Sequence, residues 1–288
     1  MPITVRSNLI VPEILQEAVR GEFVGVTALL NSGAAAVSAT LPESARGGDV
    51  LKVPYFGTIG EYEDVAEAVA LTPANIVMTS ETATVQHSGK AIEITQWAQI
   101  AAAYADPYAE LARQLRVGFE RRMDRALIDA ANTTDLVHDV YSATTPRTLN
   151  WDVVVDARLR FGDEQEDLAL LVVHSKVLGD LLKLKDGDGR PLLVNDLQAE
   201  DRVARFAGVP VKVSDRLAPE STNPPRYTSL LLKRNALALW YNGSPEVQAD
   251  RDILRDTQVA AVHVYWIAHR YSRMPGSTRT GVVKITHN

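Results

Sequence analysis

The sequence predicts an α+β fold that combines a long helix, an extended hairpin, a long antiparallel sheet and an α/β lobe. Three observations predict it. Residues 106–131, DPYAELARQLRVGFERRMDRALIDAA, have an unbroken helical period. Residues 49–55 and 76–94 alternate apolar and polar side chains, as paired strands do. Residues 256–274 form an aromatic, β-branched stretch that is far longer than an average strand.

The predicted helix has a clear start and one apolar stripe. Asp106 can cap it, and Pro107 stands at the first helical position, where its missing N–H costs nothing. The helix is about 37 Å long, so it needs an extended surface to pack on. Its polar side mixes acids and bases, which is typical of a solvated face. The stripe is Tyr108, Leu111, Ala112, Leu115, Phe119, Met123, Ala126 and Ala130, and the polar side is Glu110, Arg113, Arg116, Glu120, Arg121, Asp124 and Arg125.

The chain before this helix cannot bury its own apolar residues. The first 45 residues contain one short amphipathic piece, Ile10 to Val19, and read as an arm that lies on another surface. The two alternating segments predict a hairpin with a long acidic tip, and HSGK at 87–90 predicts a turn. A two-stranded ribbon is marginally stable in water, so the hairpin also needs a partner surface.

Residues 145 to 245 mix short strands and helices and predict a compact α/β region. The predicted helices are 150–162 and 175–185, and the predicted strands are 168–174, 206–215, 228–234 and 236–242. The loops 186–193 and 218–227 project from it. The stretches 256–274 and 280–288 follow as further strands and are expected to build the sheet under the long helix.

Composition excludes several classes of protein. With 46% hydrophobic and 23% charged residues, the chain can bury a substantial core. It has no cysteine, which excludes disulfides, thiolate zinc sites and cysteine nucleophiles. It has neither a run of about 20 apolar residues nor the pattern of a signal peptide. A net charge of −6 opposes a general attraction to nucleic acid.

The sequence predicts no catalytic, cofactor-binding or metal-binding residue. DGDGRP at 186–191 starts like a calcium loop, but Arg190 and Pro191 stand where a ligand and the turn glycine belong. SGK at 88–90 lacks the first glycine and the Ser/Thr of a phosphate loop, which are Thr84 and Ala91 here. No G-x-S-x-G elbow of a serine hydrolase is present.

Other candidate groups also have ordinary structural interpretations. The six histidines, 87, 138, 174, 263, 269 and 287, are scattered, and none has a paired-ligand spacing on a helix. The carboxylates Glu61, Glu63, Asp64, Glu164, Glu166 and Asp167 crowd into loops, where solvated acids are expected rather than glycosidase-type acid–base catalysis. The pairs Tyr265/Trp266 and Trp240/Tyr241 are expected to fill core or subunit contacts rather than to stack on bases.

The order of these parts, with the segment FAGVPVKVSD at 206–215, resembles the major capsid proteins of tailed phages, which share the Hong Kong 97-type fold with encapsulin shells. The resemblance spans nearly the whole chain. It implies an N-terminal arm (1–45), an extended loop (46–98), a peripheral domain with the spine helix (99–144), an axial domain (145–250) and the C-terminal strands of the peripheral domain (251–288).

The resemblance implies a major capsid protein, not an enzyme, that uses no cofactor. Its copies would assemble, in the host cytoplasm, into hexamers and pentamers of an icosahedral shell in the virion, enclosing double-stranded DNA through weak, unspecific contacts. The other expected partners are a portal protein, a decoration protein, and either a separate scaffolding protein or no scaffolding protein at all. No contact with a membrane is expected. Because neither Lys52 nor Lys90 has an identifiable partner, no crosslink between copies is expected.

Two alternatives stay open at this point. An encapsulin-type nanocompartment would share the fold and enclose a protein cargo. A soluble α/β enzyme is the alternative from another class, because catalytic residues can lie far apart in a sequence.

Overall fold

The computed structural model describes residues 27–41, 50–57, 64–65, 70–71, 73, 75–95, 107–185, 189, 205–242, 246–274 and 279–288. These residues form a five-stranded sheet, a six-stranded sheet and a two-stranded ribbon, together with three α-helices. The amphipathic piece at 10–19, the cap Asp106, the acids Glu61 and Glu63, and most of the loop 186–193 lie outside the described residues. No helix in the described part is both long and apolar enough to span a membrane.

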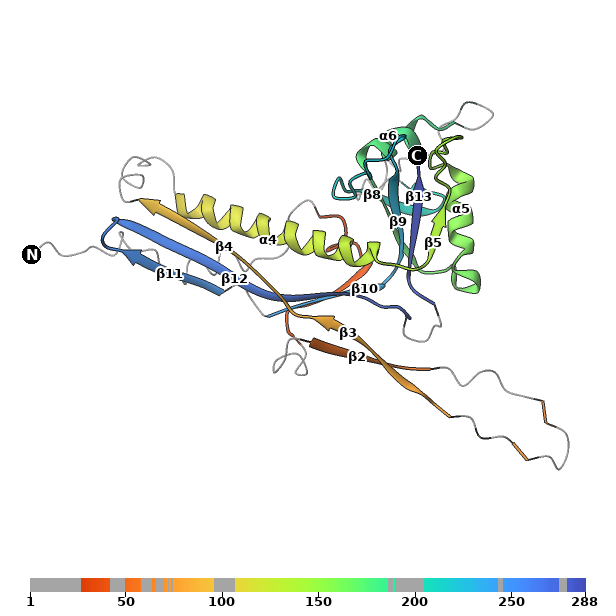
Figure 1. Cartoon of the computed structure of the whole chain (residues 1–288), viewed down its shortest axis with the longest axis horizontal. Helices are drawn as coiled ribbons and strands as arrows, with labels where there is room; N and C mark the ends of the chain where they lie inside the picture. Colours follow the sequence, from red (N-terminus) through yellow and green to blue (C-terminus); the bar gives the residue numbers. More distant parts are fainter. Residues whose placement is uncertain are drawn as a thin grey trace, which may run out of the picture.

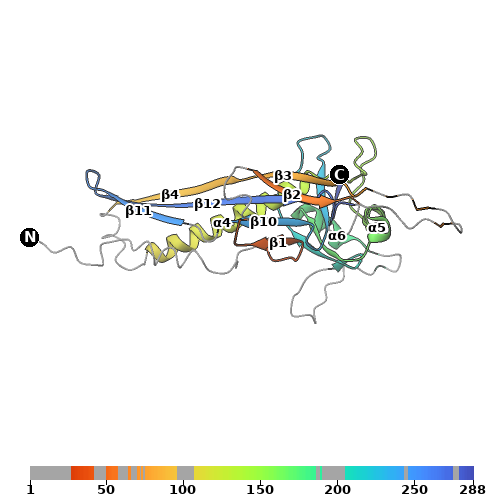
Figure 2. The same cartoon turned by 90° about the horizontal axis from the view of Figure 1, so that it is seen from below.

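The five-stranded sheet is organised around one strand of 14 residues, β12 (Thr257–Arg270), which confirms the long strand predicted there. On one side it pairs antiparallel with β4 (Gln86–Thr95). On its other side it pairs with β11 (Glu246–Asp252) and then with β10 (Leu237–Tyr241). The short β1 (Ala35–Ser38) adds to β10 in parallel. Figure 2 shows β4, β12 and β11 running side by side along the molecule.

The long helix α4 (Pro107–Asn132) lies along this sheet, as the apolar stripe predicts (Figure 1). Leu115, Met123 and Ala126 of the stripe are buried, while Phe119 and Ala130 are half-buried. The side chains of Tyr108, Leu111 and Ala112 are outside the described part. The second half of α4 packs into a core, in which its Leu127 and Ile128 join Val264 and Trp266 of β12 and Leu239 of β10.

The predicted hairpin is confirmed, but it is shorter than predicted. β2 (Val50–Phe56) pairs antiparallel with β3 (Met78–Thr84) and extends away from the rest of the molecule (Figure 1). The turn predicted at 87–90 is wrong, because these residues are the start of β4 and pair with β12. The alternation after residue 85 therefore belongs to the long sheet, since its partner is β12 rather than β2.

The six-stranded sheet forms the lobe and has the order β5-β13-β9-β6-β8-β7. The strands are β5 (Val137–Asp139), β6 (Leu168–Val173), β7 (Arg205–Phe206), β8 (Val209–Val213), β9 (Tyr227–Lys233) and β13 (Val282–His287). The helices α5 (Trp151–Leu159) and α6 (Ser175–Lys183) pack on one face. Asn150 starts α5 by accepting the Val153 N–H with its side chain at 2.9 Å.

Both faces of this second sheet are buried. Every residue of the central strand β9 is buried. Leu231 faces the core with α5 and α6, whereas Leu230 and Leu232 belong to the core formed with α4 and the long sheet. The two sheets and α4 therefore share one apolar cluster.

Two strands lie in the opposite sheet from the one that the sequence predicts. Residues 236–242 were expected in the lobe, but β10 pairs with β12 of the long sheet. The final strand was expected to complete the long sheet, but β13 pairs with β9 in the lobe. The chain changes sheets between β9 and β10, where Asn235 has a positive φ of 53° and its N–H donates to the Gly33 carbonyl. Short apolar runs carry no information about their partner strand, which explains the error.

Because His287 is buried in the lobe, we expect acid to lower the stability of the lobe. Its Nε2 lies 3.0 Å from the Ser229 hydroxyl, and burial lowers the pKa of His287 from 6.5 to about 4. The unfolded chain therefore binds this proton more readily than the folded chain, and stability falls as the pH drops from 6.5 toward 4. We expect a loss of about 2 kcal/mol in unfolding free energy between pH 7 and pH 5.

Urea unfolding of the unassembled subunit at these two pH values measures this loss. The variant His287→Gln should show a smaller loss than the unchanged chain, whatever its stability at pH 7. An identical pH dependence of the two proteins would show that His287 does not titrate in this range.

Candidate assembly surfaces

The outer part of the hairpin exposes a group of large apolar side chains, here called the hairpin patch: Phe56, Leu71, Ile76, Val77 and Met78. Phe56 is 71% and Leu71 is 75% exposed. A ribbon of two strands has no third strand and no second layer to cover it, so its apolar side chains stay in solvent. Exposed apolar groups of this kind mark surfaces that contact another molecule.

The base of the hairpin is fixed to the long sheet. Leu51 and Ala83 are buried in a small cluster with Ile267. Glu81 of β3 also lies with its carboxylate 3.0 Å from Nε2 of His269 on β12. Burial lowers the pKa of His269, and the nearby Glu81 carboxylate opposes this shift. The anchored base and the uncovered outer part together make the hairpin a projecting arm.

A second apolar surface lies at the turn between β11 and β12, at the other end of the molecule (Figure 1). Ile253 is 83% and Leu254 is 98% exposed. The turn is held in place, because the Asp252 carboxylate accepts the Leu254 N–H at 3.0 Å, and Arg251 donates to Asp256 at 3.1 Å. We call the two aliphatic residues the apolar tip. A fixed turn that presents two such side chains to solvent suits contact with a neighbouring chain.

A buried carboxylate connects three parts of the chain. Asp124 of α4 is fully buried and accepts the backbone N–H of Leu29 at 2.8 Å. It also accepts from the Arg216 guanidinium, which lies after β8 in the lobe. Glu120 is buried too and pairs with Arg116 at 3.2 Å. The prediction that Glu120 and Asp124 lie on a solvated face is therefore wrong, because both are buried. The lobe and the segment around Leu29 cover Asp124.

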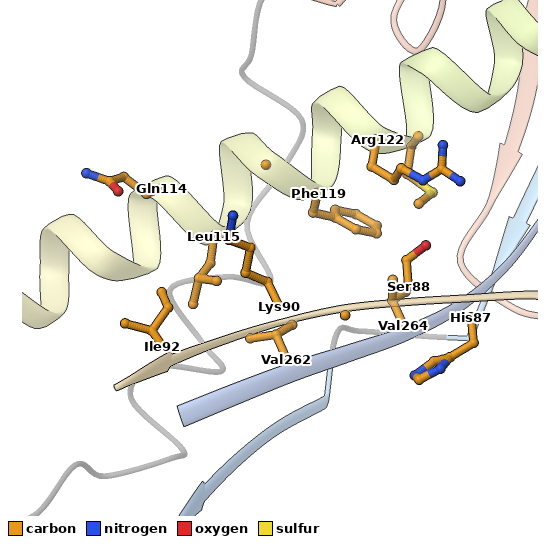
Figure 3. A pocket seen from close by; sticks show the side chains of 13 residues that line it. His87, Ser88, Lys90, Ile92, Gln114, Leu115, Phe119, Arg122, Val262 and Val264 are labelled. Carbon is orange, nitrogen blue, oxygen red and sulfur yellow. The ribbon is translucent and has the colours of Figure 1, made fainter. Parts of the chain in front are cut away.

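A hollow of about 590 Å³ lies between α4 and the long sheet (Figure 3). Its walls carry Leu115, Phe119, Val262 and Val264, with Lys90 at its side. Figure 3 shows Ser88 pointing toward the helix and His87 pointing to the opposite side of the sheet. The Ser88 hydroxyl accepts a hydrogen bond from the Trp266 indole N–H at 2.9 Å. These residues do not place a nucleophile beside a general base.

The structure puts the predicted aromatic pairs mostly in packing roles. Trp266 is buried in the main core, and Trp240 packs on the cluster at the hairpin base. Tyr241 lies edge-on to Phe119, with ring centroids 5.8 Å apart. Tyr265 is exposed and stacks on His87 instead. Among the loop carboxylates, Glu164 pairs with Lys233 at 3.2 Å.

Comparison with known proteins decides the family. Residues 34–252 match the model of the phage capsid family, which is well over half of the chain. The chain belongs to the phage capsid family. This capsid protein is also similar in structure to the capsid of an empty GTA particle, with 17% identity, a TM-score of 0.64, and 93% of this chain and 94% of that chain covered. A search of curated proteins gives no match.

Two further structures resemble this capsid protein. One is from Mycobacterium phage Che8, with 14% identity, a TM-score of 0.60, and 99% and 96% of the two chains covered. The other is the head structure of Helicobacter pylori bacteriophage KHP40, with 12% identity, a TM-score of 0.59, and 94% and 91% covered. The α+β fold is thus the Hong Kong 97-type fold predicted from the sequence. The capsid protein is a structural component of a virion shell and not an enzyme.

Proposed function

We propose that this capsid protein is the major capsid protein of a tailed phage and forms the hexamers and pentamers of an icosahedral shell around double-stranded DNA. The observation that carries the proposal is the apolar surface left uncovered at both ends of the subunit, the hairpin patch and the apolar tip. Unlike patches at opposite ends suit head-to-tail contacts, which close into rings when the rotation allows it. The similar GTA capsid, computed with C5 symmetry, supports a five-fold ring.

The strand pairings support an assignment of the chain to an arm, an extended loop, a peripheral domain and an axial domain. We infer that the arm is the part of 1–45 that precedes the buried segment around Leu29 and β1, which belong to the body of the same chain. The hairpin is then the projecting part of an extended loop within 46–98. The peripheral domain then consists of α4 and the long sheet, including β4 and β10. The axial domain consists of the six-stranded sheet with α5 and α6, including β13. This assignment modifies the boundaries 1–45, 46–98, 99–144, 145–250 and 251–288 only where a strand joins a sheet of another part.

The other proposed partners follow from this role. DNA contacts are weak and unspecific, because a chain with a net charge of −6 offers little general attraction to phosphate. A portal protein, a scaffolding protein and a decoration protein are the remaining partners of such a shell, and assembly takes place in the host cytoplasm.

Negative-stain electron microscopy of the purified protein tests the proposal. Shells or rings of copies are the expected result. Compact monomers or dimers at high concentration would overturn it. Analysis of the particle contents then separates the two kinds of container, since DNA supports the phage capsid and a protein cargo supports an encapsulin-type compartment.

The helix stripe provides a variant for the same assay. Phe119→Asp should abolish assembly, because it replaces a ring that packs on Tyr241 with a charged group at the apolar contact between α4 and the long sheet. Arg121→Asp adds the same side chain at an exposed position of the helix and should still assemble. Normal particles from Phe119→Asp would show that this part of α4 does not need its packing for assembly.

A further inference from the structure

Two histidines that are far apart in the sequence meet on the face of the long sheet opposite α4. Nε2 of His87 on β4 lies 3.2 Å from Nδ1 of His263 on β12. Tyr265 stacks on the His87 ring, with centroids 4.7 Å apart, and so limits how the ring can turn. His87 is exposed to solvent, and Figure 3 shows it pointing away from the helix.

The strand register explains why the rings meet. Tyr265 pairs with His87, and His263 pairs with Gly89, so the two histidines are diagonal neighbours on one face. Gly89 provides the room for this contact. A Cβ at position 89 would lie 3.0 Å from Nδ1 of His263 and 2.8 Å from the Val262 carbonyl oxygen. The ring of His263 therefore lies over the bare backbone of β4, which brings it to His87.

The separation of the two nitrogens suits a metal ion. Two imidazole nitrogens on a tetrahedral Zn²⁺, at bonds of roughly 2.0–2.1 Å, are roughly 3.3 Å apart. Imidazole is a preferred ligand of Zn²⁺, Cu²⁺ and Ni²⁺ but not of Mg²⁺. On the other side of β12, Glu246 of β11 is the register partner of His263. The position next to His263 across the sheet is therefore occupied by an acidic residue. In the described part of the chain no three His, Asp or Glu side chains converge on one point, so water would complete the coordination.

We propose that His87 and His263 form a binding site for a divalent cation that prefers imidazole, with Zn²⁺ as the best match. The ion would connect β4 to β12 next to the point where the chain passes from the hairpin into the long sheet. It would therefore hold the hairpin base in place from the face that α4 does not cover. This site goes beyond the role as a shell protein, and its test does not depend on what the shell contains.

Calorimetric titration of the purified protein with ZnCl₂ tests the site. The expected result is one ion per chain, and each of His87→Gln and His263→Gln should weaken binding at least tenfold. The double variant should bind Zn²⁺ only slightly more weakly than either single variant, because each single variant already leaves one imidazole, which cannot chelate the ion. Gly89→Ala should weaken binding as well, since its methyl group displaces the His263 ring.

Two controls make the result decisive. Lys90→Gln changes an exposed residue of the same strand, whose side chain points to the helix side in Figure 3, and should leave Zn²⁺ binding unchanged. MgCl₂ should give no signal. Zn²⁺ should also raise the melting temperature of the unchanged chain but not of folded His87→Gln. Absence of binding at millimolar Zn²⁺, or equal binding by the histidine variants, would overturn the proposal and leave a simple hydrogen-bonded pair.

Discussion

Replacement of both residues of the apolar tip, Ile253→Asp with Leu254→Asp, is expected to stop shell assembly and leave a folded subunit. Both side chains are almost fully exposed in the single chain, so their loss removes no packing within it. Covering a Leu or Ile side chain contributes roughly 1.5–3 kcal/mol. Two carboxylates at the same contact would also have to give up water, at a cost of several kcal/mol. The contact should therefore become unfavourable.

Size-exclusion chromatography and electron microscopy measure the loss of particles, and circular dichroism with urea unfolding confirms that the subunit is folded. Ile253→Val with Leu254→Met keeps the apolar surface and is the matched control, which should assemble. If the aspartate variant forms normal shells, the apolar tip faces solvent in the particle, and the contacts must come from other surfaces.

Removal of the buried carboxylate in Asp124→Ala should give the largest loss of stability. The change leaves the Leu29 N–H and the Arg216 guanidinium without their shared acceptor in the interior. Removing one partner of a buried ion pair costs about 3–5 kcal/mol, and we expect about 3 kcal/mol here because Arg216 retains some contact with solvent. This is a large part of the stability of an ordinary domain.

The same helix provides the control. Asp129 is exposed, and its carboxylate lies 3.9 Å from Arg125, so Asp129→Ala should change the unfolding free energy by less than about 0.5 kcal/mol. Urea unfolding of both variants, together with Arg216→Ala and the double variant, completes a double-mutant cycle. Effects of Asp124→Ala and Asp129→Ala that are equal in size would show that the junction does not depend on the buried carboxylate.

The sequence was sufficient to predict the local elements, because their signals lie within one window of the chain. The period of 106–131 predicts α4, and the length of 256–274 predicts β12. The alternation at 49–55 and after residue 76 predicts both strands of the hairpin. The exposed hairpin patch follows from the same reasoning, since a two-stranded ribbon cannot cover itself.

Which strands pair with one another, and which residues meet across the fold, could not be predicted in the same way. β10 and β13 are both short apolar strands, and nothing within either one says which sheet it joins. Asp124 looks like a surface acid until the residues that cover it, nearly 100 positions away, are placed. The contact of His87 with His263 depends on the register of β4 against β12. Gly89 could have hinted at a close approach, but in the sequence it resembles a turn residue.

The shared core of the two sheets has a consequence for how identical copies fit unequal surroundings. Because α4, β9 and β12 contribute to one apolar cluster, a packed core joins the described parts of the long sheet and the lobe. In the proposed shell each copy must occupy either a five-neighbour or a six-neighbour ring. We expect the body to tilt as a stiff plate between these positions, while bending of the outer ribbon absorbs the difference in curvature.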